Sequence, residues 1–228
     1  MTNANNIFQG KRVRLRGVEP GDWETHFKWN EDTESARTGY EIWFPTSSQS
    51  VRAWAEKESQ QTGEGEKFRF QIENLDGDLV GTINTHTCDL RCGTFRYGLA
   101  ILSEHQRKGY ASEAIQLVLR YYFEERRYQK VNAEVFSFNE PSIRLHERLG
   151  FTVEGRLRRM IYSAGTYHDI IVYGMTKDEF TATRPEILSS VCALMTLKPN
   201  QPTVRIHAPR ARKGMLEGGW AEIAPSLR

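Results

Sequence analysis

The stretch Gln106-Arg107-Lys108-Gly109-Tyr110-Ala111 connects an apolar strand, predicted over 94–102, to a strongly amphipathic helix. The helix carries apolar residues at spacings of three and four, namely Ala111, Ala114, Ile115, Val118, Leu119, Tyr122 and Phe123. The first turn of such a helix presents backbone N–H groups without helical partners, at the positive end of the helix dipole. Gly109 lets a ligand approach the backbone closely. The connection is therefore predicted to bind a phosphate-like anion, with Arg107 and Lys108 adding positive charge.

A second informative segment, residues 139–151, follows a strand predicted over 130–137. Asn139 is suited to cap a helix, Pro141 is tolerated in its first turn, and Gly150 is suited to end it. The sequence thus predicts a second strand followed by a short helix.

These two segments together resemble the cofactor-binding signatures of the GNAT acyl-CoA N-acyltransferases. The spacing Q-x-x-G-x-A over 106–111 resembles the family's pyrophosphate-binding signature. Residues 139–151 resemble its second signature, an Asn-capped helix ending in L-Y-x-x-x-G-F, with His146 in place of the Tyr. Residues 153–157 and 165–169 resemble the closing hairpin of the branch that contains ribosomal-protein N-terminal acetyltransferases, whose close relatives acetylate polyamines or antibiotics. The resemblance covers roughly residues 11 to 180.

Hydrophobic periodicity predicts the order strand, two helices, three antiparallel strands, helix, strand, helix and a final hairpin. The first strand is expected over 12–16, the first two helices after Asp22 and near Ser48, and a tight turn at Asp76-Gly77. This order indicates an α/β fold with a mixed, mostly antiparallel sheet flanked by helices. The resemblance implies that the fourth and fifth strands splay apart, so that the pantetheine arm of acetyl-CoA lies between them.

Length and composition predict one domain over 1–180 and an appended basic tail over 181–228, because 228 residues with 39% hydrophobic content can bury one substantial core. The tail can form one short helix, and its cations suit either solvent or an RNA or acidic partner. These cations are Lys198, Arg205, Arg210, Arg212 and Lys213. A net charge of +2 does not favour a nucleic-acid surface over the whole molecule.

No apolar run approaches the roughly 20 residues needed to span a bilayer, so a cytoplasmic protein without a membrane partner is expected. Cys88, Cys92 and Cys192 are few and odd in number, which argues against a disulfide framework. Although His86 lies near two of them, the set is incomplete for zinc, and no metal is expected. The sequence leaves a homodimer open.

The resemblance also implies the chemistry, in which a neutral amine attacks the thioester of acetyl-CoA without a covalent enzyme intermediate. Backbone N–H groups over 107–111 are expected to hold the pyrophosphate, with Gln106 and Asn139 beside the cofactor. A main-chain N–H near Ile101 or Leu102 is the implied donor to the developing oxyanion.

The leaving thiolate, whose thiol has a pKa of about 8.5, benefits from a proton donor. His146 is one candidate for this donor and Ser142, in the first turn of the same helix, is the other. Each also has an ordinary interpretation, as a helix histidine and as part of the helix cap.

The acceptor amine must lose a proton, which at pH 7 costs about 1.4 kcal/mol for an α-amine and about 4.6 kcal/mol for a lysine-like amine. The stretch 30–45 combines acids with aromatic residues, which suits a bound cation and equally a solvated loop. The acids are Glu31, Asp32, Glu34 and Glu41. Asp169 either faces the acceptor channel or pins the closing hairpin. Ile161 stands where some ribosomal-protein relatives have a glutamate.

The predicted function is transfer of an acetyl group from acetyl-CoA to a protein or peptide N-terminus, which the closing hairpin favours. A polyamine or aminoglycoside-type acceptor is the alternative that the acidic stretch favours. A third alternative is a module that binds acyl-CoA without catalysis, owing to the change from Tyr to His146.

Overall fold

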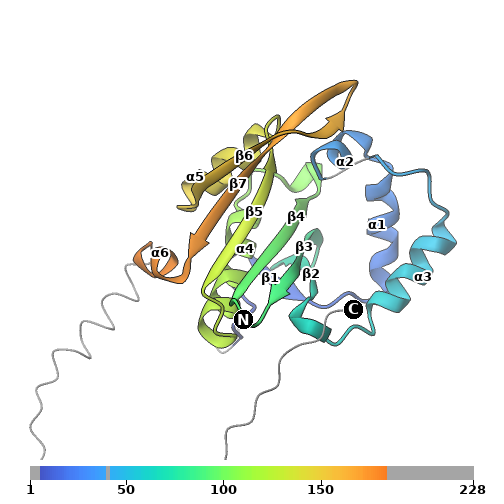
Figure 1. Ribbon diagram of the computed structural model, residues 1–228. Helices are drawn as coiled ribbons and strands as arrows, with labels where there is room; N and C mark the ends of the chain where they lie inside the picture. The colour runs from blue at the N-terminus through green and yellow to red at the C-terminus, as the bar shows by residue number, and fades with distance from the viewer. Residues whose placement is uncertain (1–5, 40–41, 184–228) are drawn as a thin grey trace, which may run out of the picture.

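The computed structural model describes residues 6–39 and 42–183. A single sheet with strand order β1-β2-β3-β4-β5-β7-β6 forms its centre (Figure 1). Its strands are β1 Val13–Arg16, β2 Arg69–Asn74, β3 Leu79–Asp89, β4 Thr94–Ile101, β5 Lys130–Phe136, β6 Thr152–Ser163 and β7 Thr166–Thr176. All neighbouring strands are antiparallel except β4 and β5. The predicted α/β fold with a mixed, mostly antiparallel sheet is confirmed.

The helices are α1 Trp23–Asn30, α2 Thr33–Gly39, α3 Ser48–Glu58, α4 Tyr110–Arg120, α5 Glu140–Arg148 and α6 Lys177–Ala182. The helix α2 lies in the stretch that the sequence predicted to be irregular. It forms because Asp32 caps it, accepting hydrogen bonds from the backbone N–H of Ser35 at 3.0 Å and from its hydroxyl at 2.6 Å. Part of the acidic stretch is therefore a short helix.

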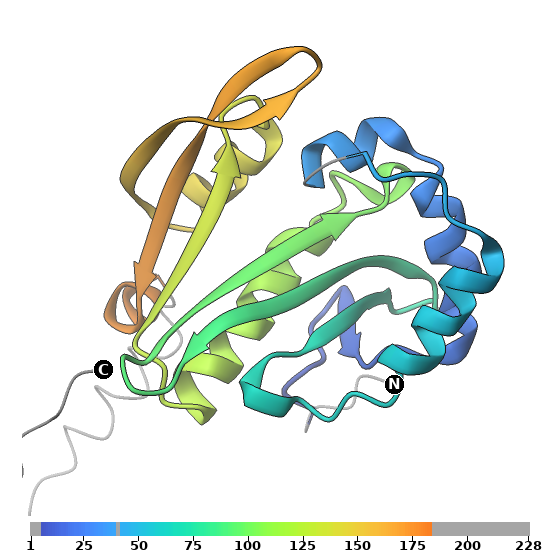
Figure 2. The same ribbon diagram turned by 45° about the vertical axis from the view of Figure 1, so that its right-hand side comes forward.

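Helices cover both faces of the sheet, with α4 and α5 on one face and α1 and α3 on the other (Figures 1 and 2). On the first face, the hydroxyl groups of Thr85 on β3 and Tyr122, in the π-helical turn that extends α4, lie 2.6 Å apart. On the second face, Gln71 on β2 hydrogen-bonds to His26 on α1 at 2.7 Å. Thr85 and Gln71 thus connect the sheet to helices on its two opposite faces.

The helix α1 begins after Asp22, as predicted, but the Asp22 carboxylate does not cap it. The carboxylate instead accepts two hydrogen bonds from the Arg16 guanidinium, at 2.8 and 2.9 Å, and one from the backbone N–H of Glu19 at 2.8 Å. A bidentate arginine pair is a stronger interaction for a carboxylate than a single cap bond. Asp22 therefore ties α1 to β1.

The strands β4 and β5 pair only over Thr94 to Arg96 and then diverge (Figure 2). Each strand keeps its other neighbour beyond this point, since β4 remains paired with β3 up to Ile101 and β5 with β7 up to Phe136. The expected splay between the fourth and fifth strands is confirmed, and it opens toward the carboxyl ends of both strands.

Near the end of the described chain, α6 extends two residues past the predicted domain boundary at 180 and buries Phe180 against Phe123, with ring centroids 5.4 Å apart. The remainder of the predicted basic tail, 184–228, lies outside the described residues. None of the helices that the structure describes is long and apolar enough to cross a bilayer.

Candidate active site

A cavity of about 100 Å³ occupies the splay between β4 and β5. Its lining comes from two strands and three helices: Thr38, Tyr97, Gly98, Leu99, Ile115, Ala133, Glu134, Val135, Phe136, Asn139, Ser142, Leu145 and His146. Three of the predicted site residues, on the α5 segment, therefore meet at this cavity. The side chains of Ile115 and His146 close it on the face covered by α4 and α5.

The backbone of β4 offers donors to this cavity. The N–H of Leu102 donates to the carbonyl of Val80 at 3.0 Å, so it is used inside the sheet. Because pairing alternates along an antiparallel strand, the N–H groups of Leu99 and Ile101 point away from β3 and toward the splay. Of the two predicted oxyanion donors, Ile101 is thus the one whose N–H is directed toward the splay.

The predicted phosphate-binding turn follows β4 and a short 3-10 helix, Ser103–His105, and ends at Gly109, the N-cap of α4, which has a φ of 86°. Gln106 folds back and donates from Nε2 to the carbonyl of Ile101 at 3.2 Å. Arg12 donates from Nη1 to the carbonyl of Lys108 at 3.0 Å, and a Cβ added at Gly109 would lie 2.2 Å from that nitrogen. The backbone angle therefore favours glycine, and a Cβ would also displace the Arg12 guanidinium.

Glu113, in the first turn of α4, fixes this turn to the start of β1. Its carboxylate accepts hydrogen bonds from the backbone N–H groups of Lys11, Arg12 and Val13 at 2.9, 2.7 and 2.8 Å. Neither Arg12 nor Glu113 was among the predicted site residues. An acid in a first helical turn is an ordinary complement to the dipole, and nothing in the local sequence indicates a partner a hundred residues away.

His146 lies buried beneath the cavity, with only 5% of its surface exposed. Its Nδ1 lies 2.8 Å from the carbonyl oxygen of Ser142, which only accepts, so Nδ1 carries the proton. The neutral ring then accepts at Nε2 from the hydroxyl of Tyr97, 2.8 Å away. Burial lowers the pKa of His146, and burial raises that of Tyr97. Both ring nitrogens thus have partners inside the protein.

Ser142 and Asn139 line the cavity from the start of α5. Asn139 caps the helix by accepting from the backbone N–H of Ser142 at 3.1 Å, and it donates from Nδ2 to the carbonyl of Thr38 at 3.3 Å. The Ser142 hydroxyl lies 3.4 Å from Nδ1 of His146. Asn139 therefore joins α2 to the mouth of the cavity, and Ser142 presents its hydroxyl there.

Asp169 lies on β7 outside this cavity and holds an irregular part of β6. It accepts from Nε of Arg156 at 2.6 Å and from the backbone N–H of Arg159 at 2.9 Å, within the register shift between Leu157 and Ile161. The hydrogen bond from Arg159 and the Arg156 guanidinium lower the pKa of Asp169. These contacts match the hairpin-pinning role considered from the sequence.

The predicted acceptor-binding acids lie around α2. Hydrogen bonds from Ser35 lower the pKa of Asp32, and Glu34 forms an ion pair with Arg37 at 3.3 Å. Glu31 is exposed at the end of α1, while Glu41 lies outside the described residues. The three described acids share one region near the cavity mouth but do not line the cavity itself.

This chain is similar to known proteins in sequence and in fold. The family model described as an acetyltransferase (GNAT) domain matches residues 12–152. The SPbeta prophage-derived uncharacterized N-acetyltransferase YokL of Bacillus subtilis strain 168 is 43% identical over 177 residues, covering 78% of this chain and 97% of YokL. The chain belongs to the GNAT family of acetyltransferases.

Two further similar proteins have names that refer to different acceptors. The putative ribosomal N-acetyltransferase YdaF of Bacillus subtilis strain 168 is 33% identical to this GNAT enzyme over 105 residues, or 46% of this chain and 57% of YdaF. The crystal structure of spermidine N-acetyltransferase from Vibrio cholerae, in complex with CoA and spermine, has a TM-score of 0.66 at 22% identity. The match covers 75% of this chain and 99% of the spermidine N-acetyltransferase chain, and it shows that the two chains share a fold.

As a GNAT acetyltransferase, the enzyme takes its acetyl group from acetyl-CoA. The described residues fit this cosubstrate in two respects. The splay leaves strand edges unpaired on both sides of a narrow cavity, where an extended arm can hydrogen-bond to backbone. The turn after β4 combines a helix N-terminus with Arg107 and Lys108, which suits a pyrophosphate.

Proposed function

We propose that this GNAT enzyme acetylates the N-terminal amine of a protein or peptide. The proposal rests on the observation that the carboxylates near the cavity are weak bases. Glu134 is the one carboxylate among the described residues that line the cavity, and it is ion-paired with Arg96. Asp32 and Asp169 have lowered pKa values because of the hydrogen bonds that they accept. Such a site favours an α-amine, whose deprotonation costs about 3 kcal/mol less than that of a lysine-like amine.

In the proposed reaction, a backbone N–H group and the hydroxyl of Ser142 donate the hydrogen bonds. The N–H of Ile101 donates to the carbonyl oxygen of the thioester as negative charge develops there. The amine nitrogen forms the new C–N bond and the C–S bond breaks, while the amine's proton passes to water. Ser142 donates a hydrogen bond to the leaving sulfur. The Nδ1–H of His146 donates to the carbonyl of Ser142, so His146 fixes the turn of α5 that carries this hydroxyl. His146 is then a positioning residue, held by Tyr97.

A polyamine is the second candidate acceptor. The exposed acids Glu31 and Glu34 lie near the cavity mouth, where they would attract a polycation. The similarity to a spermidine N-acetyltransferase supports the same acceptor class. An aminoglycoside-type antibiotic shares this polycationic chemistry.

Release of the coenzyme A thiol from acetyl-CoA tests these alternatives. The panel contains peptides with free N-termini, the same peptides with blocked N-termini, spermidine and an aminoglycoside, and cofactor binding is measured in parallel. Turnover confined to free N-termini is expected. Turnover confined to spermidine or the aminoglycoside would overturn the proposal and assign the acids around α2 to substrate binding.

A further inference from the structure

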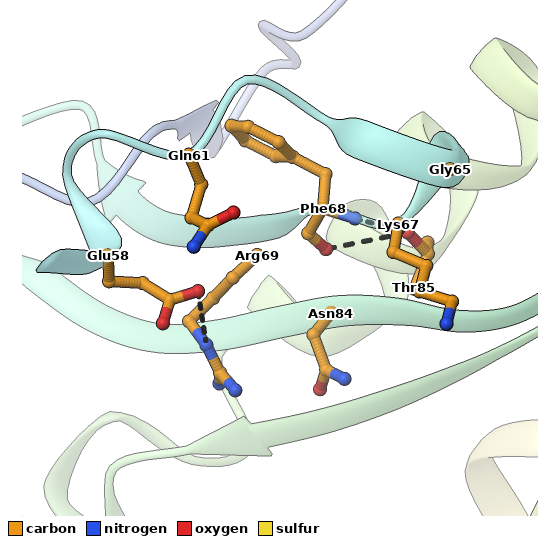
Figure 3. Close-up of a pocket in the computed structure, with 8 residues that line it drawn as sticks. All are labelled: Glu58, Gln61, Gly65, Lys67, Phe68, Arg69, Asn84 and Thr85. Atoms are coloured by element: carbon orange, nitrogen blue, oxygen red, sulfur yellow. Dashed lines mark hydrogen bonds and ion pairs between the residues drawn. The ribbon is translucent and has the colours of Figure 1, made fainter. Parts of the chain in front are cut away.

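A second cavity, of about 530 Å³, lies beside Arg69 and Asn84 (Figure 3). It lies between the end of α3, the start of β2 and the middle of β3. Its lining is mostly polar or charged: Glu58, Gln61, Gly65, Lys67, Phe68, Arg69, Asn84 and Thr85. None of these residues belongs to the cofactor site described above.

A row of paired residues connects this cavity with the splay. Arg69 on β2 pairs with Asn84 on β3, and Asn84 pairs with Gly98 on β4. Directly opposite residues of neighbouring strands share one face, and a Cβ added at Gly98 would lie 3.0 Å from Oδ1 of Asn84. Gly98 itself lines the splay cavity. Since strands lie about 4.8 Å apart, the Arg69 backbone is roughly 10 Å from that of Gly98.

The sheet face that carries Asn84 lies opposite to the one covered by α4, because the adjacent Thr85 contacts Tyr122. On the opposite face, Ile115 of α4 and His146 of α5 close the splay cavity. On the Asn84 face, Gly98 has no side chain to block the way. An acceptor that reaches the splay from this side therefore passes along the row toward Arg69.

The charges of the cavity favour an anion over a cation. Lys67 and Arg69 supply two positive charges, and Figure 3 shows their side chains and that of Asn84 pointing to the same side of the sheet. Glu58 supplies one negative charge, but its Oε1 lies 3.8 Å from Nε of Arg69, which is too long for a hydrogen bond. That Nε is buried and has no hydrogen-bond partner among the described residues. A ligand in the cavity would therefore meet the terminal nitrogens of Arg69, whose side chain is 32% exposed and ion-paired with Glu58.

We propose that this cavity binds a carboxylate of the acceptor peptide, through Arg69 and Lys67, while the peptide's N-terminal amine lies in the splay. An extended peptide advances about 3.3 Å per residue, so a distance of roughly 10 Å matches an acidic side chain near the third residue. The inference rests on the proposed N-terminal acceptor and makes it more specific. A polyamine, which carries no anion, gains nothing from this cavity.

Matched hexapeptides that differ only in Glu or Gln at the third residue test the inference. For the unaltered enzyme, the KM of the Glu peptide is expected to be about 10-fold lower, as is typical of a charge-assisted hydrogen bond. Arg69→Gln should reduce this preference to less than about 2-fold and leave the KM for acetyl-CoA unchanged. Arg69→Lys should retain part of the preference, which separates loss of charge from misfolding.

Lys67→Gln provides a second variant, because Lys67 is exposed and its replacement leaves the packing intact. Arg91→Gln, in the exposed turn between β3 and β4, is the matched control and should keep the full preference. Equal KM values for the two peptides with the unaltered enzyme would overturn the inference while leaving the proposed function standing.

Calorimetric binding of the two N-acetylated product peptides to the CoA-saturated protein gives a readout that does not depend on turnover. Tighter binding of the Glu product, lost in Arg69→Gln, supports the cavity. Equal binding of both products, or no binding of either, overturns the inference. If the enzyme acetylates only spermidine, the turnover measurement overturns the proposed function. The affinities for the two product peptides then decide separately whether the cavity binds a carboxylate.

Discussion

The donor side and the acceptor side of this enzyme are built in different ways. The proposed donor side consists of two short continuous segments, 106–111 and 139–146, and we expect it to present mainly backbone groups to its ligand. The proposed acceptor side joins side chains from α2, β2, β3 and the region of β6 and β7, which are far apart in the sequence. Backbone recognition is encoded locally and is therefore readable from a short motif, whereas side-chain recognition depends on the completed fold.

If donor binding rests on the backbone around Gly109, one side chain there should have the largest effect. Gly109→Asp places a carboxylate next to the expected pyrophosphate and crowds Arg12. We expect the Kd for coenzyme A to rise at least about 100-fold, or roughly 3 kcal/mol.

The matched control is Gly77→Asp in the turn between β2 and β3. Gly77 has a similar φ of 96°, and nothing lies within 4 Å of its Cβ position. It should therefore show the strain of the backbone angle without the change in cofactor affinity. Equal affinities for Gly109→Asp and the unaltered protein would show that the pyrophosphate binds elsewhere.

The next largest effect should separate Ser142 from His146. We expect Ser142→Ala to lower kcat about 30-fold, roughly 2 kcal/mol, with little change in the KM for acetyl-CoA, because only the leaving sulfur loses a donor. His146→Phe should lower kcat less, and its main cost should be stability, because the buried hydroxyl of Tyr97 loses its acceptor.

Kinetics and urea unfolding of both variants measure these effects. A collapse of kcat in His146→Phe with near-normal kcat in Ser142→Ala would reverse the assignment and make His146 the proton donor.

The secondary-structure elements that carry the proposed donor side were almost all predicted from the sequence. The strand before Gln106, the helix after Gly109 and the cap at Asn139 all follow from local periodicity and turn chemistry, and the splay followed from the family resemblance. Arg12 and Glu113 could not be found in this way, because their contact joins β1 to α4 across most of the domain. The environment of His146 on α5 could not be predicted either, since its partner Tyr97 lies on β4, far away in the sequence.

On the acceptor side, the sequence identified residue types but not their use. The carboxylate of Asp32 reads equally well as a ligand for a cation and as a helix cap, and only the formation of α2 decides which contacts it makes. Arg69 and Asn84 carry no local motif, and only the register of β2, β3 and β4 places them beside the splay.

A smaller effect is expected on the free energy of unfolding, at the contact between His26 on α1 and Gln71 on β2. Burial lowers the pKa of His26 to about 4, so the unfolded chain binds a proton that the folded chain does not bind between pH 6.5 and 4. Stability is therefore full above pH 6.5 and falls as the pH drops. Between pH 7.5 and pH 5, His26 should account for a loss of about 2 kcal/mol in the free energy of unfolding.

The variant His26→Gln removes this titration and keeps a polar partner for Gln71. Urea unfolding at both pH values should show a smaller pH dependence for the variant, although the buried His146 still contributes in the same direction. An unchanged pH dependence would show that His26 is not the group that titrates.

The smallest effect is expected from Glu34→Gln. The side chain of Glu34 is 82% exposed in its pair with Arg37, so the change should alter stability negligibly and the KM for peptides less than about 2-fold. The KM for spermidine, measured in parallel, is the informative control. A rise of 5-fold or more for spermidine would move the acceptor side toward polycations.

The contact between Glu113 and the start of β1 also bears on how the enzyme is made. Its three hydrogen bonds join residues 100 to 102 positions apart. Closing a loop of that length costs about 4 kcal/mol of chain entropy before any contact repays it. During synthesis, the turn before α4 therefore cannot be anchored until α4 has left the ribosome. A nascent chain that stops earlier can pair β1 with β2 but leaves the N–H groups of residues 11–13 without the Glu113 carboxylate.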